Sequence, residues 1–224
     1  MKKNPGNFAV KTFTGFESHL PANLQGTLKG IHSPFDVQEY LYSMTYNAES
    51  RDRSPLNVML DNQCHCLDGG FLAALLLSKL GHKPLILDLV PAPGMDDDHV
   101  LAPYQVDGCW GAVAKSNYVQ LGFREPVYRD FRKLAMSYFE HYMNTHRQKT
   151  LRGYTRPMDL SKLDPAWTWD EAAANRLYKK FYTRKLIPLI TPKMAKRLNL
   201  VRESIFKTET LGTDMSWVFG IREE

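Results

Sequence analysis

The chain has few cysteines and no long apolar run. These two features argue against a disulfide-rich secreted domain and against a membrane-spanning protein. Three cysteines in 224 residues are an odd number, which does not suggest the disulfide framework of a small secreted domain. No apolar run approaches the ~20 residues that a membrane-spanning helix needs. Lys2 and Lys3 have no apolar segment behind them. We therefore expect no signal peptide, a cytoplasmic protein and no membrane partner.

Internal repeats and low-complexity segments are also absent, so one globular unit is the simplest organisation. Hydrophobic residues make up 43% of the chain and charged residues 24%, as in an ordinary globular protein. A length of 224 residues suits one large core. We predict a single domain over residues 1–224, with a core at about 33–123 and a helical C-terminal extension at about 124–224.

Charge is unevenly distributed along the chain. Residues 1–112 carry 8 Lys and Arg against 12 Asp and Glu, whereas residues 113–224 carry 21 against 12. A basic half can attract nucleic acid, an anionic substrate or an acidic partner. No nucleic-acid-binding motif accompanies the charge, so we favour solvated helix faces and do not expect a nucleic-acid partner.

One stretch combines reactive side chains with a buried helix. Cys64-His65-Cys66-Leu67-Asp68-Gly69-Gly70 runs directly into seven apolar residues, 71–77. An apolar surface on all sides predicts a buried central helix from about Cys66 to Leu80, ended by Gly81 as a left-handed cap. A thiol at the start of such a helix feels the positive end of the dipole, which lowers its pKa. Cys66 is therefore a candidate nucleophile.

Two strands after this helix predict a hairpin. His99–Val106 and Trp110–Lys115 flank Asp107-Gly108, a strong two-residue turn signal. With that turn, paired positions sum to 215, so His99 lies opposite Ser116 and beside Asn117. Pro103 cannot donate to a ladder, which predicts a local edge or a bulge there.

The remaining elements are predicted from periodicity and caps. A buried strand is expected at Pro84–Val90, and shorter strands are expected at Phe8–Phe13, Ser204–Thr208 and Trp217–Ile221. Helices are expected from Ser33 (with Val37, Leu41 and Met44 on its apolar stripe), from Glu125 through Tyr142, from Thr168 to before Pro188, and around Pro192–Leu198. Polar or basic connections are expected at Asn47–Pro55, Pro91–Asp98 and Arg147–Arg156.

The order of a cysteine at a helix start, a histidine at a strand start and polar groups on the next strand suits acyl transfer. The thiolate attacks a carbonyl, the imidazole moves the proton, and a third group orients the imidazole. Asp96-Asp97-Asp98 would place negative charge near His99 and favour an imidazolium beside a thiolate.

The same residues carry a resemblance to a known family. The segment from Cys66-Leu67-Asp68-Gly69-Gly70 to Leu80-Gly81 resembles the nucleophile helix of the transglutaminase-like superfamily, which shares the papain-like cysteine-protease architecture. His99 through Trp110 resembles that family's second block, and Trp110 to Tyr128 is similar to uncharacterised bacterial members. The resemblance implies an α+β fold in which the nucleophile helix packs on a small antiparallel sheet, with extra C-terminal helices.

The resemblance also implies roles for individual residues. Cys66 matches the nucleophile and His99 the general base, and the substrate is expected beside Asp68, Gly69, Trp110 and Ser116. The family's acid, four residues past the Trp, is replaced by Ala114. Asn117 is our candidate for orienting His99, since papain-like enzymes use an asparagine there; Asp98 and Asp68 are the alternatives.

Other interpretations of these residues stay open. Cys66 can be a small buried hydrophobe, Cys64 is the competing nucleophile, and His99 can be a hydrogen-bonded structural histidine. Cys64, His65 and Cys66 lack the usual zinc spacings even with His82 or Asp96–Asp98 added, so we predict no metal site and no cofactor.

We therefore expect a thiol-dependent acyl-transfer enzyme of the protease, amidase or transglutaminase type, acting on a peptide, a protein or a small amide. The alternative of a different class is a transglutaminase-like binding or scaffold module without catalysis, which Ala114 favours. A basic nucleic-acid-binding protein is a third alternative.

Overall fold

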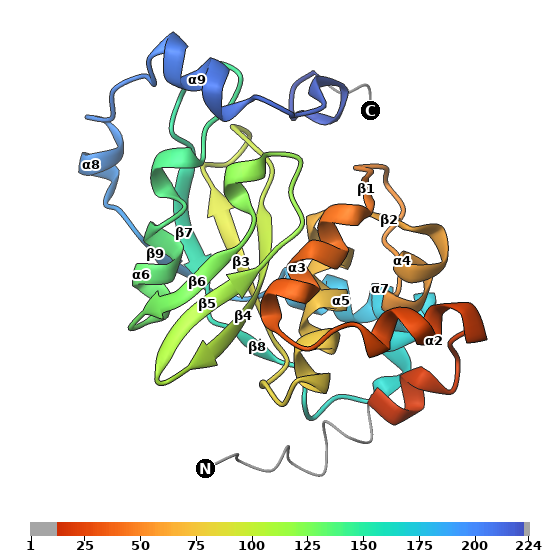
Figure 1. Cartoon of the computed structure of the whole chain (residues 1–224). Helices are drawn as coiled ribbons and strands as arrows, with labels where there is room; N and C mark the ends of the chain where they lie inside the picture. Colours follow the sequence, from red (N-terminus) through yellow and green to blue (C-terminus); the bar gives the residue numbers. More distant parts are fainter. Residues whose placement is uncertain (1–12, 222–224) are drawn as a thin grey trace.

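A computed structural model describes residues 13–221 of the chain. Figure 1 shows a β-sheet on one side and a group of helices on the other. The helices are α2 Ala22–Lys29, α3 Pro34–Ser43, α4 Pro55–Asp61, α5 Cys66–Lys79, α6 Phe131–Met136, α7 Glu171–Phe181, α8 Pro192–Ala195 and α9 Glu203–Glu209. The strands are β1 Thr45–Tyr46, β2 Gln63–Cys64, β3 Leu85–Pro91, β4 His99–Val106, β5 Cys109–Val113, β6 Arg124–Tyr128, β7 Leu151–Thr155, β8 Met158–Asp159 and β9 Leu186–Pro188.

The main sheet has seven strands and is antiparallel throughout. Its order is β6-β5-β4-β3-β7-β9, and β8 pairs with the beginning of β3. Strands β1 and β2 form a separate two-stranded parallel sheet. The fold is therefore a mixed α/β arrangement, as predicted, but its sheet is larger than expected.

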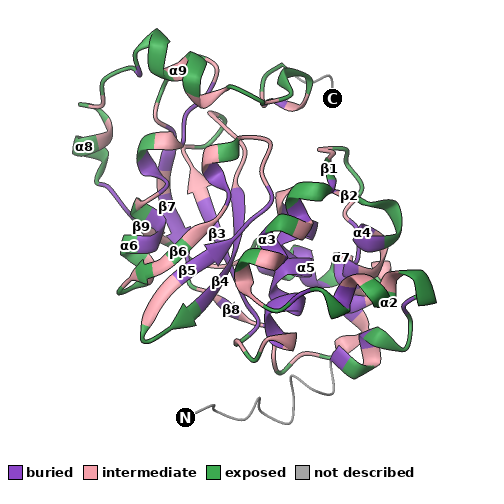
Figure 2. Ribbon diagram, viewed as in Figure 1, coloured by how far each residue is buried: buried purple, intermediate pink, exposed green. Residues whose placement is uncertain are grey.

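Helix α5 is the buried central helix that the sequence predicts. Twelve consecutive residues, 67–78, are buried, and Figure 2 shows the helix between the sheet and the other helices. His65 caps its first turn together with Asp68, and Gly81 follows its end with a φ of +87°. A Cβ on Gly70 would lie 2.9 Å from Val100 Cγ1, so glycine allows α5 to approach β4 closely.

The β4–β5 hairpin has the predicted register. Its pairs run from Ala102 with Val113 to Val106 with Cys109, and positive φ angles at Asp107 and Gly108 match the predicted turn. Pro103 lies beyond Leu101, the last β4 residue that pairs with β3. The predicted local edge at this proline is confirmed.

Each face of the sheet is covered by its own cluster of buried residues. On one face, Val100 and Ala102 of β4 belong to the cluster around α5. On the other face, Leu101 packs with the cluster around α6. Because neighbouring strand residues alternate between faces, Val100 and Ala102 point towards α5, whereas Leu101 points to the cluster around α6.

The start of α3 is confirmed, whereas the predicted long helix from Glu125 is wrong. Ser33 caps α3 in a capping box with Asp36. Residues 124–128 instead form β6, which pairs with β5, and α6 is a single short helix. Aromatic residues at helical spacing misled the prediction because each packs separately on the sheet, as Tyr138 and Tyr142 do.

The region predicted to be a C-terminal helical extension also supplies strands. Residues 151–155, expected within a basic linker, form β7 and pair with both β3 and β9. Helix α7 begins at Glu171 with Asp170 as its cap, two residues after the predicted cap Thr168, and α8 confirms the short helix expected at Pro192.

The expected strand at Ser204–Thr208 lies within α9, where Glu203 and Lys207 form an ion pair one turn apart. Trp217 ends a 3₁₀ helix rather than starting a strand. Of the expected strand Phe8–Phe13, all but Phe13 lies outside the described residues. Between residues 13 and 221, no helix combines the length and the apolarity needed to cross a bilayer.

Candidate functional site

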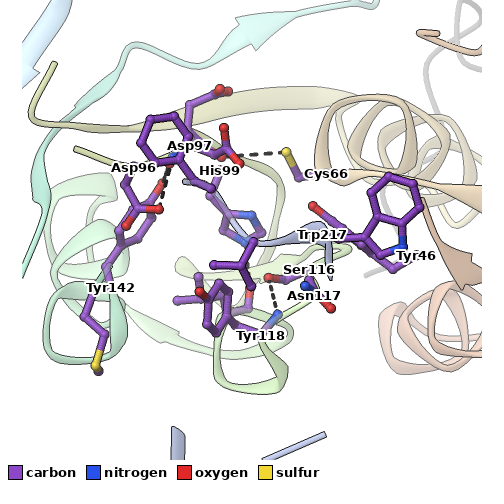
Figure 3. Close-up of a pocket in the computed structure, with 15 residues that line it drawn as sticks. Tyr46, Cys66, Asp96, Asp97, His99, Ser116, Asn117, Tyr118, Tyr142 and Trp217 are labelled. Carbon is purple, nitrogen blue, oxygen red and sulfur yellow. Dashed lines mark hydrogen bonds between the residues drawn. The ribbon is translucent and has the colours of Figure 1, made fainter. Parts of the chain in front are cut away.

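Cys66 is the first residue of α5 and faces a small cavity. Its Sγ donates to the carbonyl oxygen of Asp98 over 3.7 Å. The cavity has a volume of about 40 Å³ and is lined by Cys66, His99, Ser116 and Asn117 among others. Figure 3 shows these side chains around it. Four of the seven predicted site residues thus come together from α5, from the start of β4 and from the segment after β5.

His99, the first residue of β4, has a fixed tautomer. Its ring is buried, and Nε2 lies 2.7 Å from the carbonyl oxygen of Leu121. A carbonyl oxygen only accepts hydrogen bonds, so Nε2 must carry the proton. In the neutral ring, Nδ1 then holds the lone pair that can accept a proton from a nucleophile.

Asn117, predicted to orient His99, makes its side-chain bonds elsewhere, and the ring nitrogen Nε2 of His99 contacts the Leu121 carbonyl. The Asn117 amide bonds the backbone of Asp214, through Nδ2 at 2.7 Å and Oδ1 at 3.0 Å. The hairpin ends before this residue, so its side chain is free to turn towards the C-terminal segment. Ser116 also lines the cavity, and its Oγ accepts from the amide of Tyr118.

The other three predicted substrate-binding residues do not line this cavity. Asp68 is fully buried and bonds the amides of His65 and Gly69. Gly69 faces Cys64 and Lys115, whose side chains would meet a Cβ at about 3 Å. Trp110 packs on Phe131 at the other face of the sheet, with 4.2 Å between ring centroids. Their roles in the structure are packing and capping.

Burial distinguishes the two cysteines of the motif. Cys64 is fully buried in the core, where its Sγ contacts Met44 Sδ at 3.9 Å. Cys66 is only partly buried and is the cysteine that lines the cavity. Within residues 13–221, no group of three or more His, Cys, Asp or Glu is arranged to hold a metal ion.

The electrostatics of the site differ from the expected thiolate–imidazolium pair. Burial, followed by the charges of Asp98 and Asp97, raises the pKa of the Cys66 thiol well above its usual value. Burial also lowers the pKa of His99 to about 4, against the opposing effect of the Leu121 carbonyl. Here burial and the carboxylates outweigh the helix dipole. The resting pair is therefore a neutral thiol and a neutral imidazole.

Ala114 occupies the position where the resemblance places an acid. It is fully buried, and its backbone exchanges two hydrogen bonds with the side chain of Gln38 from α3, at 3.0 and 2.9 Å. These two hydrogen bonds to one amide side chain hold the end of the hairpin against α3. No acid stands at this position behind His99.

The C-terminal segment forms part of the site and was missed in the sequence. Trp217, Val218 and Phe219 line the same cavity as Cys66 and His99, and Figure 3 shows Trp217 on the side of Cys66. Val218 is buried. The sequence signal for this segment is its aromatic-rich run, which predicts a strand instead. We call residues 214–219, pinned at Asp214 by Asn117, the strap.

A second cavity meets the first at Cys66. It has a volume of about 170 Å³, and Tyr46, Cys66, Asp97 and Asp98 line both cavities. Its remaining walls carry the polar side chains Glu49, Ser50, Asp52, His65 and Tyr182, with Ala48. Cys66 is thus reached from an acidic side and from a side covered by the strap.

Comparisons with known proteins add no family to this geometry. No family model matches the chain, and no curated protein matches it.

Proposed function

We propose that the protein is a thiol-dependent acyl-transfer enzyme that acts on amide or peptide bonds, with Cys66 as nucleophile and His99 as general base. The observation that carries this proposal is the shared cavity of Cys66 and His99. The bond from Nε2 to Leu121 supports it further, since it leaves Nδ1 as the basic nitrogen. The resemblance to the transglutaminase-like superfamily and its papain-like core supports the same assignment.

The proposed reaction needs no group beyond these residues, the substrate and water or an amine. Cys66 Sγ attacks the carbonyl carbon while its proton passes to His99 Nδ1. The tetrahedral intermediate collapses, Nδ1 returns the proton to the departing amine, and a thioester remains on Sγ. Water or a second amine then attacks the thioester, gives its proton to Nδ1, and Sγ is protonated again as the acyl group leaves.

The neutral resting state determines how this attack proceeds. Because the thiol of Cys66 is protonated and His99 is neutral, proton transfer must accompany the attack, as it does for a serine nucleophile. The amide of Cys66, the first of α5, has no acceptor within the helix and can stabilise the oxyanion, whereas the amide of Leu67 is capped by His65 Nδ1. This mechanism predicts slow reaction with simple thiol reagents and faster acylation by a bound substrate.

Acyl-enzyme trapping tests the proposal directly. The protein is mixed with an activated aryl ester or with peptide amides, quenched in acid and measured by intact mass and peptide mapping. We expect one acyl group on Cys66, none in Cys66→Ala, and acylation slowed by about 10²–10⁴-fold in His99→Gln, which keeps a donor for the Leu121 carbonyl.

Cys109→Ser is the matched control, because Cys109 is also partly exposed but lies in β5 outside both cavities. Its acylation should equal that of the unaltered protein. Acyl groups that appear equally on Cys66 and Cys109 would reflect unspecific thiol chemistry and would contradict the proposal.

A binding module without catalysis is the second candidate, and one observation favours it. The same charges that raise the pKa of Cys66 oppose a reactive thiolate, and the strap covers one approach to it. In that case no substrate acylates Cys66, and peptide binding persists unchanged in Cys66→Ala.

A further inference from the structure

Two buried carboxyl groups lie beside Cys66, and the proposed mechanism does not use them. Asp88 in β3 pairs with Val100 of β4, and Asp98 precedes Val100 by two residues. Residues two apart on a strand share a face, so both carboxyl groups point to the side of α5. Val100 marks that side, because it lies against Gly70.

The two carboxyl groups act on each other, and Asp98 raises the pKa of Asp88. Asp88 Oδ1 and Asp98 Oδ2 are also buried oxygens that no donor group within residues 13–221 reaches. Two ionised carboxylates have only acceptor oxygens, so these two oxygens can bond each other only if one of the carboxyl groups carries a proton. One proton on the pair supplies the donor that the surrounding side chains do not.

The surroundings of the pair favour that proton. Burial, and then the charge of Asp98, raises the pKa of Asp88 well above its usual range, and burial raises the pKa of Asp98 as well. The Tyr182 hydroxyl opposes this effect, because it lowers the pKa of Asp98. Within residues 13–221, the main groups that act on the pair include no Lys or Arg. The other titratable groups that act on it or feel its charge are His65, Cys66, Asp97 and Tyr142.

The pair is connected to Cys66 through Asp98. The carbonyl oxygen of Asp98 accepts from Cys66 Sγ, and Asp98 lines both cavities that meet at this thiol. The charges of Asp98, Asp97 and Asp88 each disfavour its thiolate. A pair that held two negative charges instead of one would therefore make Cys66 less reactive.

We propose that Asp88 and Asp98 share a single proton and that this shared proton tunes the nucleophilicity of Cys66. Both are positioning residues, since they act through Cys66 rather than on the substrate. While the proton is bound, the pair carries one charge and keeps Asp98 in place against Sγ. Once the proton leaves at alkaline pH, the second charge opposes the thiolate and pushes the strands apart. The role assigned to Cys66 rests on the proposed function, whereas the shared proton does not.

Infrared spectroscopy and thiol alkylation test the two parts on the full chain. With ¹³C-labelled aspartate, the unaltered protein at neutral pH should show the carbonyl stretch of a protonated, buried carboxyl group, and Asp88→Asn should lose it. In a Cys109→Ser background, the rate of Cys66 alkylation by iodoacetamide is followed between about pH 6 and pH 10.

The two variants have different expected alkylation profiles. Asp88→Asn keeps a donor for Asp98, and the pair keeps the same charge at neutral pH. Its rate of Cys66 alkylation should therefore equal the parent rate at neutral pH and exceed it several-fold at alkaline pH. Asp98→Asn removes the charge nearest Sγ and should be faster by about tenfold for each unit by which the thiol pKa falls. Asp159→Asn is the matched control, since Asp159 also pairs with β3 but bonds Lys83 at 2.8 Å; it should change neither readout.

Two results would overturn this inference. One is the absence of a protonated carboxyl band in the unaltered protein at neutral pH, which needs no variant to fold. The other is an alkylation profile that Asp88→Asn and Asp98→Asn leave unchanged. Neither readout uses an acyl substrate, so failure of the proposed function appears separately, as a missing acyl-enzyme.

Discussion

Asn117 holds Asp214 through both polar atoms of its amide: Nδ2 donates to the carbonyl of Asp214 at 2.7 Å, and Oδ1 accepts from its amide at 3.0 Å. The two residues are 97 positions apart in the chain. This reciprocal contact pins the strap at its beginning, and the strap continues into the cavity that holds Cys66 and His99.

Asn117→Ala should therefore loosen the strap and expose Cys66. Losing two largely exposed hydrogen bonds is worth about 1–2 kcal/mol, which corresponds to alkylation of Cys66 faster by roughly 5–30-fold. Iodoacetamide labelling followed by peptide mapping measures the change. Gln105→Ala is the control, because Gln105 makes an exposed side-chain bond to the Gly108 carbonyl away from the strap and from both cavities. Equal labelling in both variants would mean that the strap does not limit access.

His99 should make stability depend on pH in the acid range. Its pKa is about 4 in the folded protein and near 6.5 when unfolded, so between these values the unfolded chain binds more protons. The contribution of His99 to stability is complete above pH 6.5 and is lost as pH falls towards 4, by about 3 kcal/mol. Urea unfolding of the parent and of His99→Gln at several pH values isolates this effect. The free-energy difference between them should shrink with acidification, and a constant difference would contradict the buried neutral histidine.

Gly70→Ala should destabilise the contact between α5 and β4. The added Cβ would lie 2.9 Å from Val100 Cγ1 and 3.2 Å from Ile86 Cδ1, and overpacking of this kind costs about 1–3 kcal/mol. Gly26→Ala in α2 is the matched control, since nothing lies within 4 Å of its added Cβ and alanine should stabilise the helix by up to about 1 kcal/mol. The midpoint of thermal unfolding should therefore fall in Gly70→Ala and rise in Gly26→Ala. A rise in both midpoints would show that β3 and β4 shift to accommodate the added Cβ without cost.

Arg53→Met should be strongly destabilising although Arg53 lies outside the cavities. Its side chain is almost fully buried and contacts Glu49, Asp61 and Asp68. Removing it leaves Asp68 buried at the start of α5 without its cation, which costs about 3–5 kcal/mol. Lys83→Met breaks an exposed pair with Asp159 and should cost less than about 1 kcal/mol. Similar losses in the two variants, measured by urea unfolding, would show that Asp68 does not need Arg53.

The sequence was most informative where local chemistry decides the structure. The apolar run after Cys66, the cap at Gly81 and the turn at Asp107-Gly108 each act within a few residues, and α5 and the β4–β5 hairpin follow them. Cys66 and His99 were found because both lie at ends of these elements.

The failures came from long-range pairing. β7 forms because β3 and β9 pair with it on either side. The sequence of residues 151–155 does not by itself predict those partners. The position of the strap depends on its contacts with Asn117 and on the cavity that it lines. These contacts are long-range, and its apolar residues by themselves predict a strand. The prediction that Asn117 lies beside His99 extends the hairpin register beyond Ala102 and Val113, the last residues that pair.

The Leu121 carbonyl carries a consequence for any mutational survey of this protein. Every amino acid at position 121 presents the same oxygen, so an alanine scan would pass over the group that fixes the tautomer of His99. Comparison of related chains would miss it too, because the requirement is on backbone direction in the 3₁₀ turn at Val119–Leu121 and not on residue type. A search by side chains alone would report Cys66 and His99, and it would miss the main-chain carbonyl that holds the His99 ring.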